Sequence, residues 1–132
     1  MIFRKADEKD FEILVNLHSR QLLEEGQDKE GNIDVEFLSF LSVKTRSKEL
    51  VEWVAEEDDR IIAMGGILFM EYPPSLNNPS GKKGYITNMY TIHEYRGQGI
   101  AGKVLEKLEK EAKTKGITRL VLHASEMGKK PM

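Results

Sequence analysis

Apolar residues recur along this chain at two spacings, one typical of helices and the other typical of strands. In the first part of the chain they return every three or four positions, so they share one side of a helix. We expect this helix to cover residues 8–25, with Asp7 as its N-cap and Gly26 at its end. Its apolar side is formed by Phe11, Leu14, Val15, His18 and Leu22.

A short strand over residues 2–5 is expected before this helix, and a second helix after it. Asp34 is a suitable N-cap for the second helix, because its carboxylate can accept a hydrogen bond from a free backbone N–H. The side of this helix that faces the core is predicted to hold Phe37, Leu38 and Leu41.

Two antiparallel strands are predicted next, joined by a tight turn at Asp58-Asp59. The first strand alternates in polarity, which is typical of a half-exposed strand. The return strand, over 60–70, is more apolar, and we expect it to be more buried. Gly65-Gly66 within it indicates a bulge or a close backbone approach. In the first strand, one side is expected to hold Val51, Trp53 and Ala55, and the other side Glu52, Val54 and Glu56.

After a long loop over residues 72–84, the chain predicts a strand, a helix and a further strand. The strands are expected at 85–92 and 117–124, with a parallel crossover between them, and Gly116 ends the helix. The order of all these elements predicts one α/β domain, residues 1–132, with a mixed central β-sheet flanked by helices. The apolar stripe of the last helix consists of Ala101, Val104, Leu105, Leu108 and Ala112.

Composition narrows the classes of protein to consider. The chain has 132 residues, 39% of them hydrophobic, a net charge of −2 and no cysteine. A domain of this size can bury a core without disulfides, and the lack of cysteine excludes a thiolate metal site and a cysteine nucleophile. The near-neutral charge argues against a nucleic-acid partner, and the longest apolar run, over 61–70, is too short to cross a membrane. We therefore expect a cytoplasmic protein without a metal.

The candidate chemistry lies between Tyr90 and Lys103, where a predicted strand runs through a loop with glycines into a helix. Gly97 and Gly99 allow the backbone to turn so that successive N–H groups point to one place. The positive end of the helix dipole lies at the same place, and Arg96 adds a cation beside it. We interpret the loop as a cradle for a phosphate or a diphosphate.

Two other interpretations of these glycines stay open at this point. Gly97 and Gly99 can serve only to make a tight turn. Together with Gly102 they also match the spacing of a dinucleotide-binding loop, although that loop follows its strand directly, whereas His93–Arg96 intervenes here. No Gly-Lys-Ser/Thr sequence of a nucleotide-binding P-loop follows them.

The hexapeptide Arg96-Gly97-Gln98-Gly99-Ile100-Ala101, with Asn88-Met89-Tyr90-Thr91-Ile92 before it, resembles the (Gln/Arg)-x-x-Gly-x-(Gly/Ala) signature of the GNAT superfamily of N-acetyltransferases. The order of elements over residues 2–124 resembles that family as well. This resemblance implies that acetyl-CoA is the cosubstrate, that the loop amides hold its diphosphate, and that its pantetheine arm pairs with Met89, Tyr90 and Thr91. It also implies transfer of the acetyl group to a primary amine of a small molecule or a peptide, by direct attack in a ternary complex.

The residues that would move protons are not defined by the resemblance. The predicted strand 85–92 carries no carboxylate, so Glu71 and Tyr85 are candidates by position only, as are His18 and Glu24. Each also has a plain structural explanation: His18 lies on an apolar helix face and is expected to be a packing residue, and Glu71 ends a strand in solvent.

The last predicted strand is followed by only a few residues, whereas members of the family continue with a further helix and strand. The segment from His123 to Gly128 resembles a subgroup in which a tyrosine of that helix is the general acid, and this sequence ends at Met132 without such a tyrosine. We expect this region to be missing or supplied by another chain, which predicts a homodimer formed through this end or else instability as a monomer. The equally plain alternative is that the natural protein is longer. The alternative functions are a catalytically silent CoA-binding module or truncated assembly partner, and a regulatory domain that binds a nucleotide or phosphate.

Overall fold

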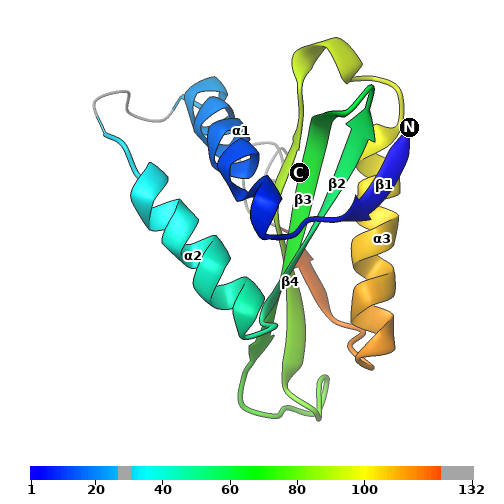
Figure 1. The fold of residues 1–132 in the computed structure, drawn as a ribbon. Coiled ribbons are helices and arrows are strands. Elements are labelled where there is room, and N and C mark those ends of the chain that lie inside the picture. Colours follow the sequence, from blue (N-terminus) through cyan, green and yellow to red (C-terminus); the bar gives the residue numbers. More distant parts are fainter. Residues whose placement is uncertain (27–30, 123–132) are drawn as a thin grey trace.

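The computed structural model describes residues 1–26 and 31–122 of the chain. Its elements, in chain order, are β1 (Ile2–Lys5), the 3-10 turn η1 (Glu8–Asp10), α1 (Phe11–Glu24), α2 (Asp34–Arg46), β2 (Leu50–Glu57), β3 (Arg60–Glu71), β4 (Lys82–Thr91), the 3-10 turn η2 (His93–Tyr95), α3 (Ile100–Thr114) and β5 (Leu120–Leu122). The helices α1 and α2 cover one face of the central sheet, and α3 covers the other (Figure 1). This order of strands and helices is the one that the sequence predicts.

The five strands form one sheet in the order β1-β2-β3-β4-β5. Neighbouring strands are antiparallel except for β4 and β5, which are parallel. A parallel pair needs a crossover connection, and α3 supplies it. Asp58 and Asp59 make the tight turn between β2 and β3, with φ angles of 53° and 62°, which a two-residue hairpin turn of this kind requires. The predicted mixed sheet is therefore confirmed.

The 3-10 turn η1, which leads into α1, is capped by two aspartates. The carboxylate of Asp7 accepts a hydrogen bond from the N–H of Lys9 at 3.2 Å, and that of Asp10 accepts one from the N–H of Asp7 at 2.9 Å. This reciprocal capping box satisfies N–H groups that have no partner within the helix. The predicted cap at Asp7 is confirmed, although the first turn is a 3-10 turn and α1 begins at Phe11.

The prediction that Asp34 caps α2 is wrong, because Asp34 is the first residue of the helix. The side chain that accepts a hydrogen bond here belongs to Asn32, whose Oδ1 lies 2.9 Å from the backbone nitrogen of Asp34. Asp34 instead places a negative charge in the first turn, where the helix dipole favours it.

Two predicted core positions lie at the surface. Leu38 of α2 is 40% exposed, and Ala101 of α3 is exposed as well. Phe40 packs against the core from α2, and Ile100 is buried one position before Ala101. Helical spacing identified the right helices, but it located the edge of each apolar face only to within a few positions.

The prediction of a half-exposed first strand is wrong for β2, because helices cover both faces of the sheet. Val54 and Ala55 are both fully buried, although they point to opposite faces. Glu52, on the same face as Val54, is only 3% exposed. Trp53 is half-buried on the α3 face, where its Nε1 donates a hydrogen bond to Glu111 at 2.9 Å.

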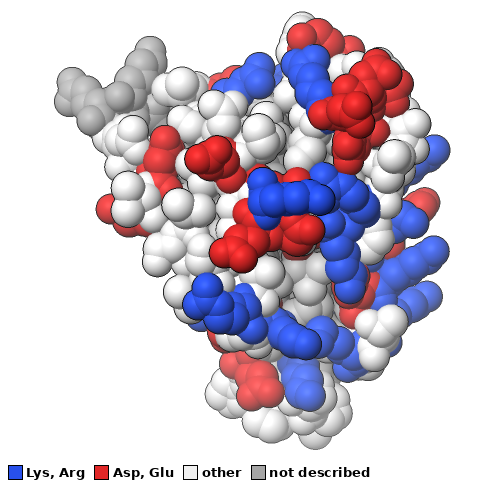
Figure 2. Space-filling model, viewed as in Figure 1, with Lys and Arg blue, Asp and Glu red and all other residues white. Residues whose placement is uncertain are grey.

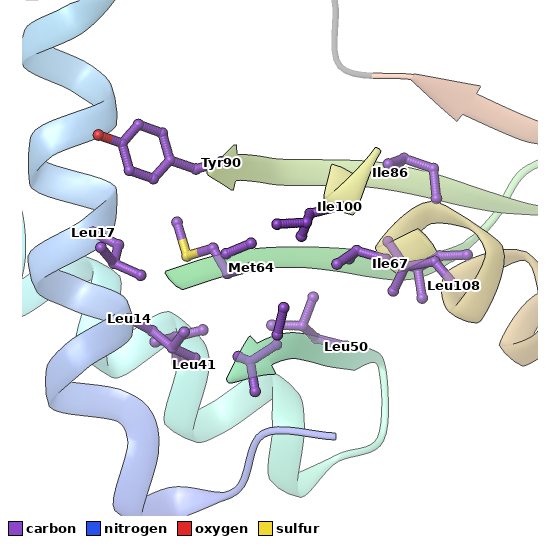
Figure 3. Packing of buried hydrophobic residues seen from close by; sticks show 14 of the residues in the cluster. Leu14, Leu17, Leu41, Leu50, Met64, Ile67, Ile86, Tyr90, Ile100 and Leu108 are labelled. Carbon is purple, nitrogen blue, oxygen red and sulfur yellow. The ribbon is translucent and has the colours of Figure 1, made fainter. Parts of the chain in front are cut away.

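The apolar core fills the space on both faces of the sheet. Figure 3 shows Leu14, Leu41 and Met64 on the side of α1 and α2, and Ile67 and Leu108 on the side of α3. Each fully buried side chain of this kind contributes about 1.5–3 kcal/mol relative to an exposed one. The core therefore holds β3 and β4 firmly from both sides, and the end of β4 is a rigid support for the loop that follows.

The strand β4 contains a bulge, and the bulge lies opposite a glycine of β3. The register between these strands shifts by one residue between Met64 and Gly66, so Gly65 faces two residues of β4, Asn88 and Met89. Asn88 has a φ angle of 59°. A Cβ atom on Gly65 would lie 2.4 Å from the sulfur of Met89. The bulge predicted at Gly65-Gly66 is therefore confirmed, although the extra residue belongs to β4. The atoms that come closest to the Cβ positions of the two glycines belong to side chains and not to the backbone.

The connection from β3 to β4 is shorter than predicted. Because β4 begins at Lys82, the loop covers residues 72–81 instead of 72–84. The polar residues Lys82 and Lys83 pair with the exposed end of β3, and this pairing, not their hydrophobicity, makes them part of the strand.

The last described strand, β5, is also shorter than predicted. It pairs with Gly84–Ile86 of β4, while residues 117–119 are not in a strand. Positions 123 and 124 of the predicted strand lie outside the described residues. Within residues 1–26 and 31–122, no strand pairs with Thr87–Thr91 on the β5 side of β4.

Replacing Gly65 with alanine is expected to lower the free energy of unfolding by about 1–3 kcal/mol, because the added Cβ overpacks the space beside Met89 and Val104. Gly102→Ala is the control, since a Cβ on Gly102 meets nothing within 4 Å. Urea denaturation measures both changes. A Gly65→Ala variant as stable as the wild type would contradict this close packing.

Candidate functional site

The loop between β4 and α3 has the backbone shape predicted for an anion site. Gly97 and Gly99 have φ angles of 79° and 78°, a region that favours glycine. Nothing lies within 4 Å of a Cβ atom built at either position. Within the part of the chain that the structure describes, no hydrogen bond engages the N–H groups of residues 97–102. Unpaired N–H groups at the N-terminus of a helix attract an anion.

Arg96, the predicted cation of this loop, binds to β4 and α1. Its Nε donates a hydrogen bond to the carbonyl of Thr91 at 2.7 Å, and its Nη2 lies 2.6 Å from Oε1 of Glu24. The guanidinium group also lies over the ring of Tyr90, 5.4 Å from its centre. The charge of Arg96 is thus paired with Glu24, and attraction for an anion comes from the backbone N–H groups.

Glu24, in the last turn of α1, ties this helix to the end of β4. Its Oε2 accepts a hydrogen bond from the hydroxyl of Tyr90 at 2.6 Å. This bond, and then the bond from Arg96, hold the pKa of Glu24 below its usual value. Burial, and then the same hydrogen bond, raise the pKa of Tyr90. Of the four candidates for proton transfer, Glu24 is the one that the structure brings to the loop.

The exposed edge of β4 next to the loop carries backbone groups that an extended ligand could use. The N–H of Ile92 bonds to the carbonyl of Ile62 in β3, and alternate residues of a strand point to opposite sides. The backbone groups of Met89 and Thr91 therefore point away from β3. Gln21 of α1 donates a hydrogen bond to the carbonyl of Met89 at 3.1 Å, as Arg96 does to that of Thr91.

A buried carboxyl group that the sequence analysis did not single out lies beside the same part of β4. Oε2 of Glu52 accepts a hydrogen bond from Nδ2 of Asn88 at 3.2 Å. Its other oxygen has no hydrogen-bond partner among the described residues. Burial raises the pKa of Glu52 to about 8, against the smaller opposite effect of Asn88. The carboxyl group is therefore mostly protonated at pH 7.

Gly66 makes room for this carboxyl group. It is the partner of Glu52 in the register between β2 and β3, and a Cβ atom on Gly66 would lie only 2.2 Å from Oε2 of Glu52. The sequence held a signal for this site, namely a glycine pair in an apolar strand, across a predicted hairpin from a glutamate.

The structure does not bring Glu71 or Tyr85 to the glycine loop. Glu71 is exposed at the end of β3 and pairs with Lys82, at the opposite end of β4 from Thr91. Nine residues of extended strand separate these two ends by about 30 Å. Tyr85 is half-buried opposite Leu68 and lies about 20 Å along the strand from Thr91.

His18 has the packing role expected of it. Its ring stacks on that of Phe37 in α2, with 3.7 Å between the ring centres. Burial lowers the pKa of His18, so the ring is neutral at pH 7. His123 lies outside the described residues.

A hollow of about 800 Å³ lies at the end of the sheet near Glu71, away from the glycine loop. Its walls include Lys44, Lys82 and Lys115 around the apolar side chain of Phe69. Figure 2 shows Lys and Arg side chains interleaved with Asp and Glu across the viewed face. In spite of its size, this hollow is not the candidate site, because neither Gly97 nor Gly99 lines it.

In the two described ranges, no three side chains of His, Cys, Asp or Glu come together as they would around a metal ion. None of the helices in these ranges is long and apolar enough to pass through a membrane.

Comparison with known proteins assigns the family. The Acetyltransferase (GNAT) family matches the sequence over residues 11–129. A predicted acetyltransferase from Clostridium acetobutylicum, whose crystal structure was determined with acetyl-CoA, is 44% identical, with a TM-score of 0.91 over 97% of this chain and 83% of that chain. No curated protein matches the sequence. The chain therefore belongs to the GNAT acetyltransferase family, and its resemblance to that family is confirmed.

Two further structures show the same fold at lower identity. A GCN5-related N-acetyltransferase from Ralstonia eutropha is 29% identical, with a TM-score of 0.87 over 96% of this chain and 85% of that chain. Glucosamine-6-phosphate N-acetyltransferase from Arabidopsis thaliana is 23% identical, with a TM-score of 0.70 over 98% of this chain and 86% of that chain. The second of these shares the fold alone.

Replacing Glu52 with glutamine is expected to change how stability depends on pH. The pKa of Glu52 is about 8 in the folded protein and 4.5 for the free side chain, so the folded state binds more protons between these values. Wild-type stability should therefore fall as the pH rises from about 4.5 to about 8, and Glu52→Gln should gain a few kcal/mol relative to it over that range.

Denaturant unfolding at pH 5 and pH 8.5 measures this difference. Glu57→Gln is the control, because Glu57 lies on the same strand and is paired with the N-terminus at 3.3 Å. Parallel pH profiles for the wild type and Glu52→Gln would show that the carboxyl group is not held neutral.

Proposed function

We propose that this protein is an acetyl-CoA-dependent N-acetyltransferase that acts on a primary amine of a small molecule or a peptide. The observation that supports this most strongly is the glycine turn at 97–99, with its unpaired N–H groups at the start of α3. The family to which the chain belongs transfers acetyl groups, and a relative with 44% identity was crystallised with acetyl-CoA.

The loop residues fit the diphosphate of coenzyme A. The N–H groups of Gly97, Gln98, Gly99, Ile100 and Ala101 are the donors that would hold its oxygens, and the positive end of the α3 dipole adds to their attraction. Among residues 1–26 and 31–122, no atom lies within 4 Å of the Cβ positions of its two glycines. The backbone can thus approach the diphosphate closely.

The backbone of Met89, Tyr90 and Thr91 would pair with the pantetheine arm, as one strand pairs with another. Gln21 and Arg96 hold the carbonyls of Met89 and Thr91, and they would release these groups when the arm binds. Arg96 would then be free to turn to the diphosphate beside it.

Acetyl transfer forms a C–N bond between the amine and the carbonyl carbon and breaks the C–S bond to coenzyme A. The amine attacks without a charge, so its ammonium form first loses a proton to a base or to water. A backbone N–H in Met89–Thr91 would stabilise the negative oxygen, and bringing the reactants together contributes up to roughly 7–11 kcal/mol. The residues that move protons, with Glu71 and Tyr85 as candidates by position, stay predictions. The amine acceptor, the homodimer and the cytoplasmic location stay predictions.

Gly99→Glu is expected to weaken acetyl-CoA binding at least about tenfold, because the new carboxylate repels the diphosphate at the turn. Gly116→Glu is a matched control. Gly116 also has a positive φ, of 71°, and open space around its Cβ position, and it lies past the other end of α3. The two variants therefore carry the same added charge and similar backbone strain. Calorimetry measures both affinities, and equal affinity in both variants would contradict the cradle.

Turnover distinguishes the enzyme from a silent CoA-binding module. We expect free thiol to be released from acetyl-CoA when a panel of primary amines is added, more rapidly as the pH rises and more of each amine loses its proton. Mass spectrometry of the acetylated amine is the second measurement. Tight binding of acetyl-CoA without release above the background, for every small amine and peptide tested, would favour the silent module.

A further inference from the structure

We infer that Glu52 is a positioning residue for the proposed site: through Asn88 it holds the bulge of β4 that presents Met89–Thr91 to the acyl carrier. This inference rests on the proposed function, since it is there that Met89–Thr91 is assigned to the carrier. Glu52 itself is not in that segment, and it acts through its neighbour.

The bulge decides which backbone groups of β4 face the open side. Before it, the N–H of Gly84 points toward β5, where it bonds to Arg119. After the bulge, the residues whose backbone groups point to this side are Met89 and Thr91. Without the extra residue, the backbone groups of Met89 and Thr91 would point toward β3 instead. The side chain of Tyr90 would also turn away from Glu24.

Asn88 carries the unusual backbone conformation of the bulge. Its φ angle of 59° lies in the left-handed region, which asparagine adopts more readily than most other residues. This conformation is still unusual within a strand. A conformation of this kind persists only where the surrounding structure holds it. The hydrogen bond from Nδ2 of Asn88 to Oε2 of Glu52 is the contact that fixes its side chain against β2.

Burying the carboxyl group of Glu52 costs more free energy than burying an apolar side chain, so packing alone does not explain its position. Glu52 is 3% exposed, and Asn88 is its one side-chain hydrogen-bond partner among the described residues. A leucine would fill such a place at less cost. Gly66, opposite Glu52, has the space that the carboxyl group needs, since a Cβ atom there would lie 2.2 Å from Oε2. Gly66 therefore leaves room for the carboxyl group of Glu52, and this carboxyl group binds the side chain of Asn88.

The bulge is held from a second side by α1. Gln21 donates its hydrogen bond to the carbonyl of Met89, the residue after Asn88. Two consecutive residues of β4 are thus held by polar groups of β2 and α1, while Gly65 of β3 packs against Met89. This arrangement fixes the segment that follows, and Glu52 is the titratable member of it.

Among the described residues, no charged side chain supports ionisation of Glu52. Gly66 of β3 and Asn88 of β4 face it, and Arg4 of the neighbouring strand β1 is paired with Asp10 and Glu56. The inward-facing titratable group of α1, His18, responds to Asp34 and not to Glu52. From α2, the buried side chains are Phe37 and Leu41. Ionisation would therefore leave a buried carboxylate with one hydrogen bond, and we expect it to disturb Asn88 as the pH rises through about 8, the pKa of Glu52.

Backbone NMR of the ligand-free protein tests this directly. The amide resonances of residues 89–91 should shift between pH 6.5 and 9.5 with a midpoint near 8 in the wild type and in Glu57→Gln, and they should lose this transition in Glu52→Gln. Glutamine keeps the oxygen that accepts from Asn88 and has no charge to gain. If residues 89–91 do not titrate in the wild type, or titrate in the same way in Glu52→Gln, the inference is overturned.

Acetyl-CoA affinity, measured by calorimetry at pH 7 and pH 9, extends the test to the site. We expect wild-type affinity to fall severalfold between these values, Glu52→Gln to lose this dependence, and Glu52→Ala to bind severalfold more weakly than Glu52→Gln at pH 7. Equal pH dependence in the wild type and Glu52→Gln would overturn the positioning role.

Turnover at pH 7 adds a third comparison. A Glu52→Gln variant that binds acetyl-CoA as the wild type does but releases no thiol would instead make Glu52 the base for the amine, and this too would overturn a positioning role. Failure of the wild type to bind acetyl-CoA at any pH would refute the proposed function itself, a result distinct from all of these.

Discussion

The first N–H groups of α3 have no partner in the described chain, and the proposed site depends on this. A helix cannot satisfy the N–H groups of its own first turn, and most helices solve the problem with a side chain just before that turn. The 3-10 turn η1, which leads into α1, is satisfied in this way by Asp7 and Asp10. In α3 the N-cap is Gly99, which has no side chain to offer. The same chain thus closes one helix start and leaves the other open, at the point where β4 ends.

Two unfavourable features of the fold lie near this point. Asn88 has a positive φ angle, and Glu52 is a carboxyl group buried with one side-chain hydrogen bond among the described residues. Strained backbone and buried polar groups persist where the rest of the structure compensates for them, and they are common at functional sites. Here the compensation comes from the apolar core on both faces of β3 and β4.

Local patterns in the sequence are enough to predict the order of the elements, the hairpin at Asp58-Asp59 and the bulge at Gly65-Gly66. They also locate the glycine loop, because Gly97 and Gly99 act through their own backbone and need no distant partner. The exposure of Leu38 does not follow from local patterns, because it depends on the angle at which α2 meets the sheet. Asn32 and Asp34 are both suitable caps and lie two positions apart, so the residue types alone do not locate the start of α2.

Glu52 and Arg96 could not be understood from local patterns for a different reason. The role of each depends on residues far along the chain: Glu52 on Gly66 and Asn88, and Arg96 on Glu24. Alternation along β2 suggested that Glu52 faces water, because the pattern does not show that helices cover both faces of the sheet. The register of three strands is needed before this carboxyl group is seen to lie beside β4.

The most direct measurement of the central claim is a crystal structure of the protein with acetyl-CoA. The account predicts that diphosphate oxygens lie within hydrogen-bond distance, about 2.7–3.2 Å, of backbone nitrogens in residues 97–101. A diphosphate bound elsewhere on the protein, with these N–H groups turned to water or to the chain itself, would contradict it.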